Sequence, residues 1–371
     1  MSIMVKEILA MAESALKEAD CTDPKLDAER LFQYQYNLDN TGLFMMKPKM
    51  LDQKEAEKYF ELVDFRLAGM PLQYITGSQE FMGLSFKVNE NVLIPRQDTE
   101  TLVEAALDYM KKADIGQDPE ADLDDDNEGN NGENQALESN QDQNQGQNQN
   151  QGQNQNQGQN QNQGQNQNQS NAIDNKKKSK IKKKTKKNKP KHKGEWKVLD
   201  LCCGSGAIGI SLIHYSVEAG KKIKVTASDV SQKAISVAID NAAKLKVEKQ
   251  MNFVHGDLFQ PFKKRFSKQK YDLIVINPPY IKTQEIPTLQ REVKDHEPML
   301  ALDGGVDGLD YYKIIMLEAK DYLEKGGVLM MEIGHDQGAD IAEIFDRNGK
   351  YSKFRVVKDL AGHDRVAVII Y

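Results

Sequence analysis

The first 76 residues carry apolar positions at a helical spacing. Apolar residues near the start recur at steps of three and four: Val5, Ile8, Leu9, Ala12 and Leu16. This spacing places side chains on one face of a helix, and the residues after Pro24 repeat it. Asp23-Pro24 suits a helix start, because proline is favoured in the first helical turn. The pattern predicts a small domain of several short helices over residues 1–76.

Near Gly77 the pattern changes from a helical to an alternating one. The stretch EFMGLSFKVNENVLIP alternates and carries a turn-like segment at Asn89 to Asn91, which predicts a β-hairpin. The following DTETLVEAALDYMKK has a helical spacing, with Asp98 or Thr99 as its N-terminal cap. Residues 77–112 are therefore predicted to form a hairpin and a helix that connect two domains.

A strongly polar tract follows over residues 113–194. It begins with acidic residues, continues as Gln/Asn repeats with a glycine every six residues, and ends in lysines. A tract of such low hydrophobicity buries too little surface to offset its ordering entropy, so it is predicted to be a disordered insertion. It holds 12 acidic residues and 12 lysines, so the rest of the chain keeps the whole net charge of −6. That balance does not favour a DNA-binding body, which usually needs a basic face.

After residue 194 apolar strands alternate with helical patterns. The expected strands are WKVLDL, KVTASDV, MNFVHGDLF, YDLIVINPPY and VLMMEIG. CCGSGAIGISLIHYS is expected to be a glycine turn that enters a helix. The other expected helices are SQKAISVAIDNAAKL and GLDYYKIIMLEAKDYLEKGG, the last closed by its glycines. This alternation predicts an α/β domain over residues 195–371 with a parallel, doubly wound sheet. KFRVVKDLAGHDRVAVIIY supplies two more strands with no helix between them, which predicts an antiparallel edge.

Three acidic residues stand at the ends of successive predicted strands. Asp200 precedes a turn of small residues, namely Cys202, Cys203, Gly204, Ser205 and Gly206. Such a turn lets a ligand approach the backbone at the start of a helix. Asp229 is placed to accept both hydroxyls of a ribose, and Asp257 to accept from an adenine amino group. Each acid alone is compatible with an ordinary turn or cap, and the glycine turn alone with a dinucleotide site.

The fourth strand ends at Asn277-Pro278-Pro279-Tyr280. Prolines end a strand in any case, so the asparagine and the tyrosine need a further explanation. With the Asp200 turn and Asp229, this quartet resembles the class I S-adenosylmethionine-dependent methyltransferases that methylate planar, conjugated nitrogens. The resemblance implies a Rossmann-like methyltransferase sheet, with S-adenosylmethionine bound at the small-residue turn and the acids.

Further stretches narrow the resemblance to one family. RLAGMPLQYITGSQEF, VLIPRQDTETLVE, HEPMLALDGGVDGLDYY and MEIGHDQG look like those of the bacterial peptide chain release factor glutamine N5-methyltransferases. The resemblance covers residues 1–112 and 195–371. It implies methyl transfer to the glutamine of the Gly-Gly-Gln motif in class-one release factors, with the N-terminal helical domain recognising that protein substrate.

The resemblance gives the quartet a chemical role. A primary amide nitrogen is a poor nucleophile, because its lone pair is delocalised into the carbonyl. If the Asn277 side-chain oxygen and the Pro278 carbonyl each accept one N–H, they hold this nitrogen and stabilise the positive charge that develops on it. Pro279 completes the turn, and Tyr280 forms an apolar wall over the flat amide. No general base is required before transfer, since the product readily loses its proton to water.

The sequence departs from the family pattern at two positions. Cys202 stands where the family turn usually begins with glycine, and Leu258 stands where relatives often have an aromatic residue. The adenine therefore packs on either Leu258 or Phe259. In IPRQDTE, Arg96 and Glu100 either border the methionine end of the cofactor or form an ion pair between domains.

Two other interpretations compete with the glutamine methyltransferase. A nucleic-acid methyltransferase would use the same quartet on adenine or guanine, but the acidic body and the N-terminal stretches argue against it. A ribosome- or RNA-binding protein without activity would act through the lysines at 176–193, but the intact Asn277 argues against that. In the favoured interpretation nucleic acid is not required, and these lysines make at most a weak contact with it.

The remaining composition indicates no metal and no membrane span. Three cysteines do not form a disulfide framework, and neither they nor the histidines have the spacing of metal ligands. The N-terminal stretch has acidic residues inside its apolar pattern, unlike a signal peptide. No run of about 18 apolar residues is present. We expect a monomeric, cytoplasmic protein.

Overall fold

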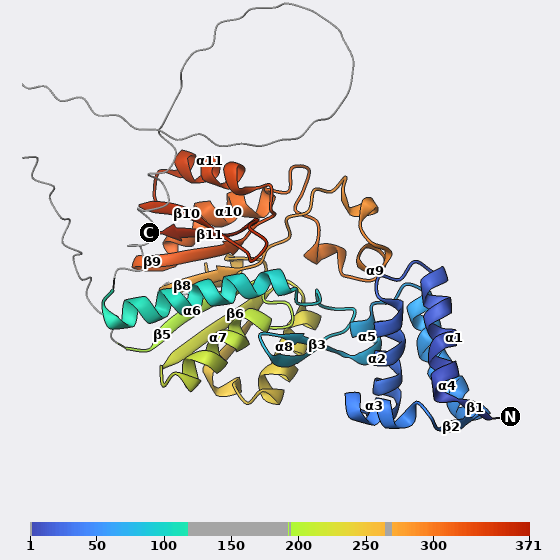
Figure 1. Ribbon diagram of the computed structural model, residues 1–371. Helices are drawn as coiled ribbons and strands as arrows, with labels where there is room; N and C mark the ends of the chain where they lie inside the picture. The colour runs from blue at the N-terminus through green and yellow to red at the C-terminus, as the bar shows by residue number, and fades with distance from the viewer. Residues whose placement is uncertain (1, 118–191, 193, 264–268) are drawn as a thin grey trace, which may run out of the picture. The chain divides into compact units, whose positions relative to one another are not determined.

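The computed structural model describes residues 2–117, 192, 194–263 and 269–371 (Figure 1). The predicted disorder of the insertion lies outside these residues, apart from its two ends. All of the described residues belong to one compact unit.

The N-terminal region is helical, as predicted. It contains α1 (Val5–Glu18), α2 (Pro24–Tyr36), α3 (Asn40–Met46), α4 (Gln53–Leu67) and α5 (Leu72–Thr76). The apolar positions of the helical pattern are buried together in one cluster. Two short strands that the pattern did not predict, β1 (Ser2–Met4) and β2 (Met50–Asp52), pair antiparallel beside these helices.

The predicted hairpin is present, but its turn lies elsewhere. Strands β3 (Ser78–Phe81) and β4 (Leu84–Lys87) are joined by Met82 and Gly83, both at positive φ (50° and 67°). Two positive φ angles are those of a tight turn that matches the twist of a hairpin. Asn89 to Asn91 follow the second strand instead, and the Asn89 side chain accepts from the Asn91 N–H at 3.0 Å.

The helix after the hairpin begins and ends differently from the prediction. A 3₁₀ turn (Gln97–Thr99) leads into α6 (Glu100–Ile115), so the helix continues beyond the predicted boundary at residue 112. Neither predicted cap makes a side-chain cap bond at its start. Asp98 pairs with Arg365 at 3.1 Å instead. The Thr99 hydroxyl is engaged at the site described below.

Seven strands form the central sheet in the order β10-β11-β9-β8-β5-β6-β7. Their bounds are β5 (Trp196–Leu201), β6 (Ile223–Asp229), β7 (Met251–His255), β8 (Tyr271–Ile276), β9 (Leu323–Glu332), β10 (Lys353–Lys358) and β11 (Asp364–Ile370). Strands β5 to β9 are parallel, and β11 is antiparallel to both of its neighbours. The predicted antiparallel edge is therefore present as the pair of β10 and β11.

One predicted helix is shorter than expected. The helix α10 (Asp310–Glu318) ends well before the glycines, and β9 already begins at Leu323. Gly326 and Gly327 lie within that strand, where the pairing with β8 shifts register. A side chain at Gly327 would lie 2.8 Å from the Glu324 carbonyl oxygen. The two glycines thus permit a bulge and do not cap a helix.

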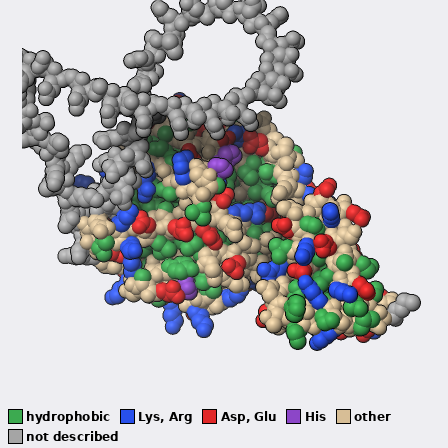
Figure 2. Space-filling model, viewed as in Figure 1, with side chains coloured by type: hydrophobic (Ala, Val, Ile, Leu, Met, Phe, Trp, Pro, Cys, Tyr) green, Lys and Arg blue, Asp and Glu red, His purple; other side chains and the backbone are tan. Residues whose placement is uncertain are grey.

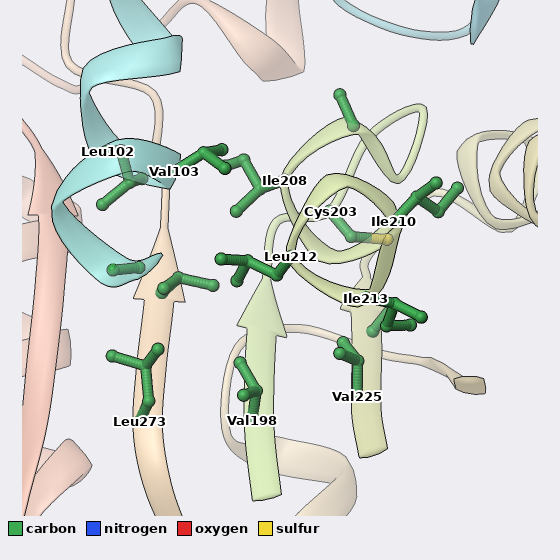
Figure 3. Close-up of a cluster of buried hydrophobic side chains, with 14 of the residues drawn as sticks. Leu102, Val103, Val198, Cys203, Ile208, Ile210, Leu212, Ile213, Val225 and Leu273 are labelled. Carbon is green, nitrogen blue, oxygen red and sulfur yellow. The ribbon is translucent and has the colours of Figure 1, made fainter. Parts of the chain in front are cut away.

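Helices cover both faces of the sheet (Figure 1). α6, α7 (Ala207–Glu218) and α8 (Gln232–Lys244) pack on one face, whereas α10 and α11 (Gly338–Asn348) pack on the other. No helix was predicted over α11. Successive residues of β8 contact opposite helix layers. Leu273 faces the layer of α6, α7 and α8 (Figure 3), and Ile274 faces the layer of α10 and α11. Burial on both faces explains why these strands are almost continuously apolar.

The remaining elements are short. A four-residue helix, α9 (Arg291–Lys294), lies in the long connection between β8 and α10. Further 3₁₀ turns are Glu248–Gln250, Gln260–Phe262, Ile286–Thr288, Met299–Ala301 and Ala319–Asp321.

Candidate active site

A cavity of about 360 Å³ opens where β5, β6, β7 and β8 end. Most of the predicted site residues line it: Cys202, Cys203, Gly204, Ser205, Asp229, Asp257, Leu258, Asn277 and Pro279. The other predicted residues lie outside its lining: Asp200, Gly206, Pro278 and Tyr280. Carboxyl ends of parallel strands are where ligands of such sheets bind.

Asp200 lies behind the cavity and holds the start of α7. Its side chain is completely buried, and Oδ2 accepts from the Gly209 N–H at 2.9 Å. Burial raises the pKa of this carboxyl to about 7. A Cβ at position 209 would lie 2.7 Å from Oδ2, so the contact requires glycine there. Asp200 therefore supports the turn from below and does not line the ligand space.

The small-residue turn has a strained backbone. Cys202 adopts φ +54°, and Gly204 and Gly206 adopt +52° and +80°. A left-handed conformation favours glycine, which explains why a glycine is usual at the position of Cys202. At Gly206 a Cβ would lie 3.0 Å from the Ile210 side chain. Burial raises the pKa of both Cys202 and Cys203, so these thiols are neutral.

Asp229 ties the turn to the second strand. Its Oδ2 accepts from the Gly204 N–H at 2.9 Å, and its Oδ1 accepts from the Ser231 N–H at 2.8 Å. Burial raises the pKa of this carboxyl, and the backbone donors lower it. A carboxylate offers about four acceptor positions, so two remain for ligand hydroxyls. This arrangement fits the predicted ribose contact.

The third strand end presents Leu258 to the cavity. Leu258 lines it at φ +41° and is buried, whereas Asp257, which also lines it, is exposed. Phe259 is 1% exposed and stacks on Tyr322, with ring centroids 4.8 Å apart. Of the two residues proposed to contact adenine, only Leu258 therefore reaches the ligand space.

Asn277 is held by a residue that the sequence marked only as a helix cap. Its Nδ2 donates to the Thr99 hydroxyl at 3.2 Å. Thr99 is buried and also lines the cavity. With the amide nitrogen engaged, the Asn277 side chain has its oxygen as the remaining acceptor. The IPRQDTE motif was the only sequence signal for this contact.

Tyr280 is fixed at both its hydroxyl and its backbone. The hydroxyl donates to Glu332 Oε1 at 3.2 Å, and the carbonyl accepts from Gln337 Nε2 at 3.1 Å. Burial and the Glu332 carboxylate raise the pKa of Tyr280. Gly304 packs against the Tyr280 backbone, where a Cβ would lie 2.7 Å from Cα. The motifs around residues 304 and 337 thus support the quartet.

Arg96 and Glu100, the two charged residues of the IPRQDTE segment considered above, have different surroundings. Arg96 lines the cavity and pairs with the buried carboxylate of Glu297, whose other oxygen accepts from the Ile94 N–H. Glu100 does not line the cavity and accepts from the Met82 N–H in the hairpin turn. Arg96 therefore combines an ion pair with a place at the ligand space, whereas Glu100 supports the hairpin.

Two further features concern the described residues alone. Within residues 2–117, 192, 194–263 and 269–371, no group of His, Cys, Asp or Glu side chains is arranged to hold a metal ion. In the same ranges, no helix is long and apolar enough to cross a membrane.

Four features together define an S-adenosylmethionine-dependent methyltransferase. They are the parallel sheet, the glycine turn at the first strand of the methyltransferase domain, the acid on its second strand and the Asn-Pro-Pro-Tyr turn on its fourth. Residues 192–364 match the family described as a methyltransferase domain, and residues 7–77 match the PrmC N-terminal domain. The chain is 31% identical over 366 residues to the release factor glutamine methyltransferase of Clostridium acetobutylicum, covering 99% of this chain and 98% of that protein.

A second relative shows the same extent of similarity. The release factor glutamine methyltransferase of Moorella thermoacetica is 31% identical over 361 residues, covering 97% of this chain and 96% of that protein. The chain belongs to the release factor glutamine methyltransferase family. S-adenosylmethionine is the methyl donor of this enzyme, and the glycine turn with Asp229 offers backbone space and acceptors that fit it.

Proposed function

We propose that this enzyme methylates the side-chain amide nitrogen of the glutamine in the Gly-Gly-Gln motif of class-one peptide chain release factors. The observation that carries the proposal is the Asn277 amide, whose nitrogen is bound by Thr99 so that its oxygen is the acceptor at the cavity. The names of relatives that align over nearly the whole chain support the same substrate.

The substrate amide has two N–H donors and a poorly nucleophilic nitrogen. Asn277 Oδ1 and the carbonyl of Pro278, a residue between the lining residues Asn277 and Pro279, each accept one of them and align the nitrogen with the methyl group that S-adenosylmethionine supplies as an electrophile. Positive charge develops on nitrogen as the bond forms, so both acceptors stabilise the transition state more than the ground state. Holding the two reactants in line provides much of the remaining acceleration.

No protein base is needed before the transfer. The methylated amide nitrogen is strongly acidic while it carries the extra proton, and water accepts that proton afterwards. The nearby Tyr280 does not serve as a base, because its hydroxyl donates to Glu332 and burial raises its pKa.

The N-terminal domain, residues 1–76, is proposed to bind the release factor. Several of its large apolar side chains are exposed: Tyr34, Phe44, Met45, Met50 and Phe65. Figure 2 shows hydrophobic side chains interspersed with charged ones over the N-terminal helices. Aromatic and Met side chains are enriched at protein interfaces, which fits a protein substrate. Residues 77–112 connect this domain to the methyltransferase domain at 195–371, with the insertion at 113–194 between them.

The same domain is joined to the active-site half of the chain by a buried ion pair. Arg66 is 5% exposed, and its guanidinium pairs with Asp27 at 2.7 Å and with Glu292 of α9 at 3.1 Å. Arg66 and Asp27 are buried and Glu292 is half-buried, and this pairing favours a fixed position for the domain. We further propose a monomeric enzyme that works in the cytoplasm, where release factors act.

The test is transfer of labelled methyl from S-adenosylmethionine to a purified release factor, with duplex DNA and ribosomal RNA as parallel substrates. Label on the glutamine of the Gly-Gly-Gln motif, mapped by mass spectrometry, is the expected result. Asn277→Ala should abolish it, while calorimetry should find cofactor affinity nearly unchanged. Label on nucleic acid alone would overturn the substrate, and equal loss of transfer and cofactor binding would overturn the role of Asn277.

A further inference from the structure

Glu332 is a buried carboxylate with no role in the reaction as described above. It ends β9, is 1% exposed, and its Oε1 accepts from the Tyr280 hydroxyl at 3.2 Å. Its second oxygen, Oε2, is buried without a hydrogen-bond partner among the described residues. A buried carboxylate oxygen without a donor is costly, so a donor close by is expected to turn toward it.

The Thr99 hydroxyl is the candidate for that donor. It lies close enough to Glu332 to lower the pKa of the carboxyl. The same hydroxyl oxygen accepts from Asn277 Nδ2 at 3.2 Å. Thr99 therefore stands between a carboxylate and the amide that the proposed reaction uses.

A hydroxyl group can serve either end of an amide. When the hydroxyl donates its own proton to another acceptor, its oxygen accepts from the amide nitrogen. When no other acceptor takes that proton, the hydroxyl can donate to the amide oxygen. An ionised Glu332 can only accept, so it takes the Thr99 proton and leaves the Thr99 oxygen to accept from Asn277. Without that acceptor, the hydroxyl is free to bind Asn277 Oδ1 and turn the amide around.

We propose that Glu332 and Thr99 form a relay that holds the Asn277 amide with its oxygen toward the substrate, which makes both of them positioning residues. The relay rests on the proposed function, in which Asn277 Oδ1 accepts from the substrate amide. A turned amide would present N–H groups to a substrate that itself offers N–H groups, and transfer would stop.

The relay makes the reaction sensitive to pH. Burial raises the pKa of Glu332 to about 7, and the groups around the carboxyl adjust it. Arg365 and Tyr280 lower this pKa, Asp98 raises it, and Tyr312 also lies beside the carboxyl. Because a raised carboxyl pKa leaves the group neutral over a wider range, the relay is intact above about 7 and is lost as the pH falls through that value.

The first test compares Thr99→Val with Thr99→Ser. Valine keeps the shape and removes the hydroxyl, so kcat should fall about tenfold or more, equivalent to about 1.4 kcal/mol in the barrier. Serine keeps the hydroxyl and should stay within about threefold of wild type, well under that cost. Cofactor affinity, measured by calorimetry, should stay near the wild-type value in both variants. Equal kcat in valine and serine variants, or a matching loss of cofactor affinity, would overturn the relay.

The second test uses Glu332→Gln and decides the question even if Thr99→Val fails to fold. Wild-type kcat at saturating substrates should rise with pH through about 7, and the variant should lack this inflection. Asp200, whose pKa is also raised to about 7, lies behind the cofactor turn, so its titration should appear in the cofactor Kd. An inflection in kcat that persists in Glu332→Gln would overturn the relay.

Failure of the relay is distinguishable from failure of the proposed function. If wild-type enzyme labels the release factor glutamine and Thr99→Val does so equally well, only the relay is wrong. If wild-type enzyme labels only nucleic acid, the proposed function is wrong. Because an exocyclic amino group of a base also offers N–H donors to Asn277 Oδ1, comparing the valine and serine variants on that substrate tests the relay separately.

Discussion

Replacing Gly308 by alanine should damage the Asn-Pro-Pro-Tyr turn from a position outside the cavity. Gly308 adopts φ +74°, and a Cβ there would lie 2.5 Å from the Tyr280 carbonyl oxygen and 2.8 Å from Gln337 Nε2. The Tyr280 carbonyl and Gln337 Nε2 are hydrogen-bonded to each other, so neither is free to move aside. Alanine at 308 must therefore displace the backbone that follows Pro278 and Pro279.

The magnitude has two parts, and a control separates them. Alanine in a left-handed conformation costs about 1–2 kcal/mol at any such position. Gly349, at the end of α11, adopts φ +60° with open space around it, so Gly349→Ala carries this part alone. Overpacking at Gly308 should add about 1–3 kcal/mol. A displacement of the turn should also lower kcat, since a shift of about 1 Å can cost on the order of a hundredfold.

The assay pairs urea unfolding with methyl transfer to a release factor. Gly308→Ala should lose more unfolding free energy than Gly349→Ala, and only Gly308→Ala should lose kcat. Cofactor affinity should remain close to wild type in both, because Gly308 is not part of the cavity lining. Equal losses of stability in the two variants, with kcat unchanged in both, would refute the reasoning.

Three other predictions concern the cofactor site and the N-terminal domain. Asp229→Ala should weaken cofactor binding by about 1–3 kcal/mol in calorimetry, and unchanged affinity would count against a ribose contact. Leu258→Ala should lower cofactor affinity, whereas Phe259→Ala should instead cost about 3–5 kcal/mol of unfolding free energy; the opposite pattern would place the adenine on Phe259. Arg66→Met should destabilise by about 3–5 kcal/mol, because it leaves a buried carboxylate unpaired. As a control, Arg347→Met removes the exposed ion pair with Glu343 and should cost less than about 1 kcal/mol of unfolding free energy. Equal losses of unfolding free energy in the Arg66 and Arg347 variants would contradict the reasoning.

The architecture was predictable because its signals are local. Apolar spacing in α1 and the apolar runs of β5 and β8 depend only on which side each residue must bury. The errors occur where a glycine has more than one use. Gly83 makes the hairpin turn and Gly327 permits a bulge in β9, although a glycine pair after a helical pattern equally predicts a helix end.

The contacts that orient the site were not predictable in this way. Thr99 and Asn277 are 178 residues apart, and Tyr280 and Glu332 are 52 apart. Nothing in the pattern around Thr99 indicates which distant side chain its hydroxyl will meet, and the local pattern alone favours a helix cap. Family resemblance marked the segments that contain these residues but not their partners. Conversely, Asp200 was predicted at the site from its place at a strand end, and it acts from behind the turn.

The Asn-Pro-Pro-Tyr turn needs this support because of its own chemistry. Pro278 and Pro279 have no N–H group, so two consecutive residues cannot be held by donors of the turn itself. The chain is fixed immediately afterwards instead, where the Tyr280 carbonyl accepts from Gln337. The Ile281 N–H donates to the carbonyl of residue 302 at 3.0 Å, and the Ile281 carbonyl accepts from the N–H of residue 304 at 2.8 Å. The segments around residues 99, 304 and 337 thus replace what the prolines remove. In the proposed function this turn presents acceptors to a substrate, so it gains by lacking donors, and the rest of the domain supplies its rigidity.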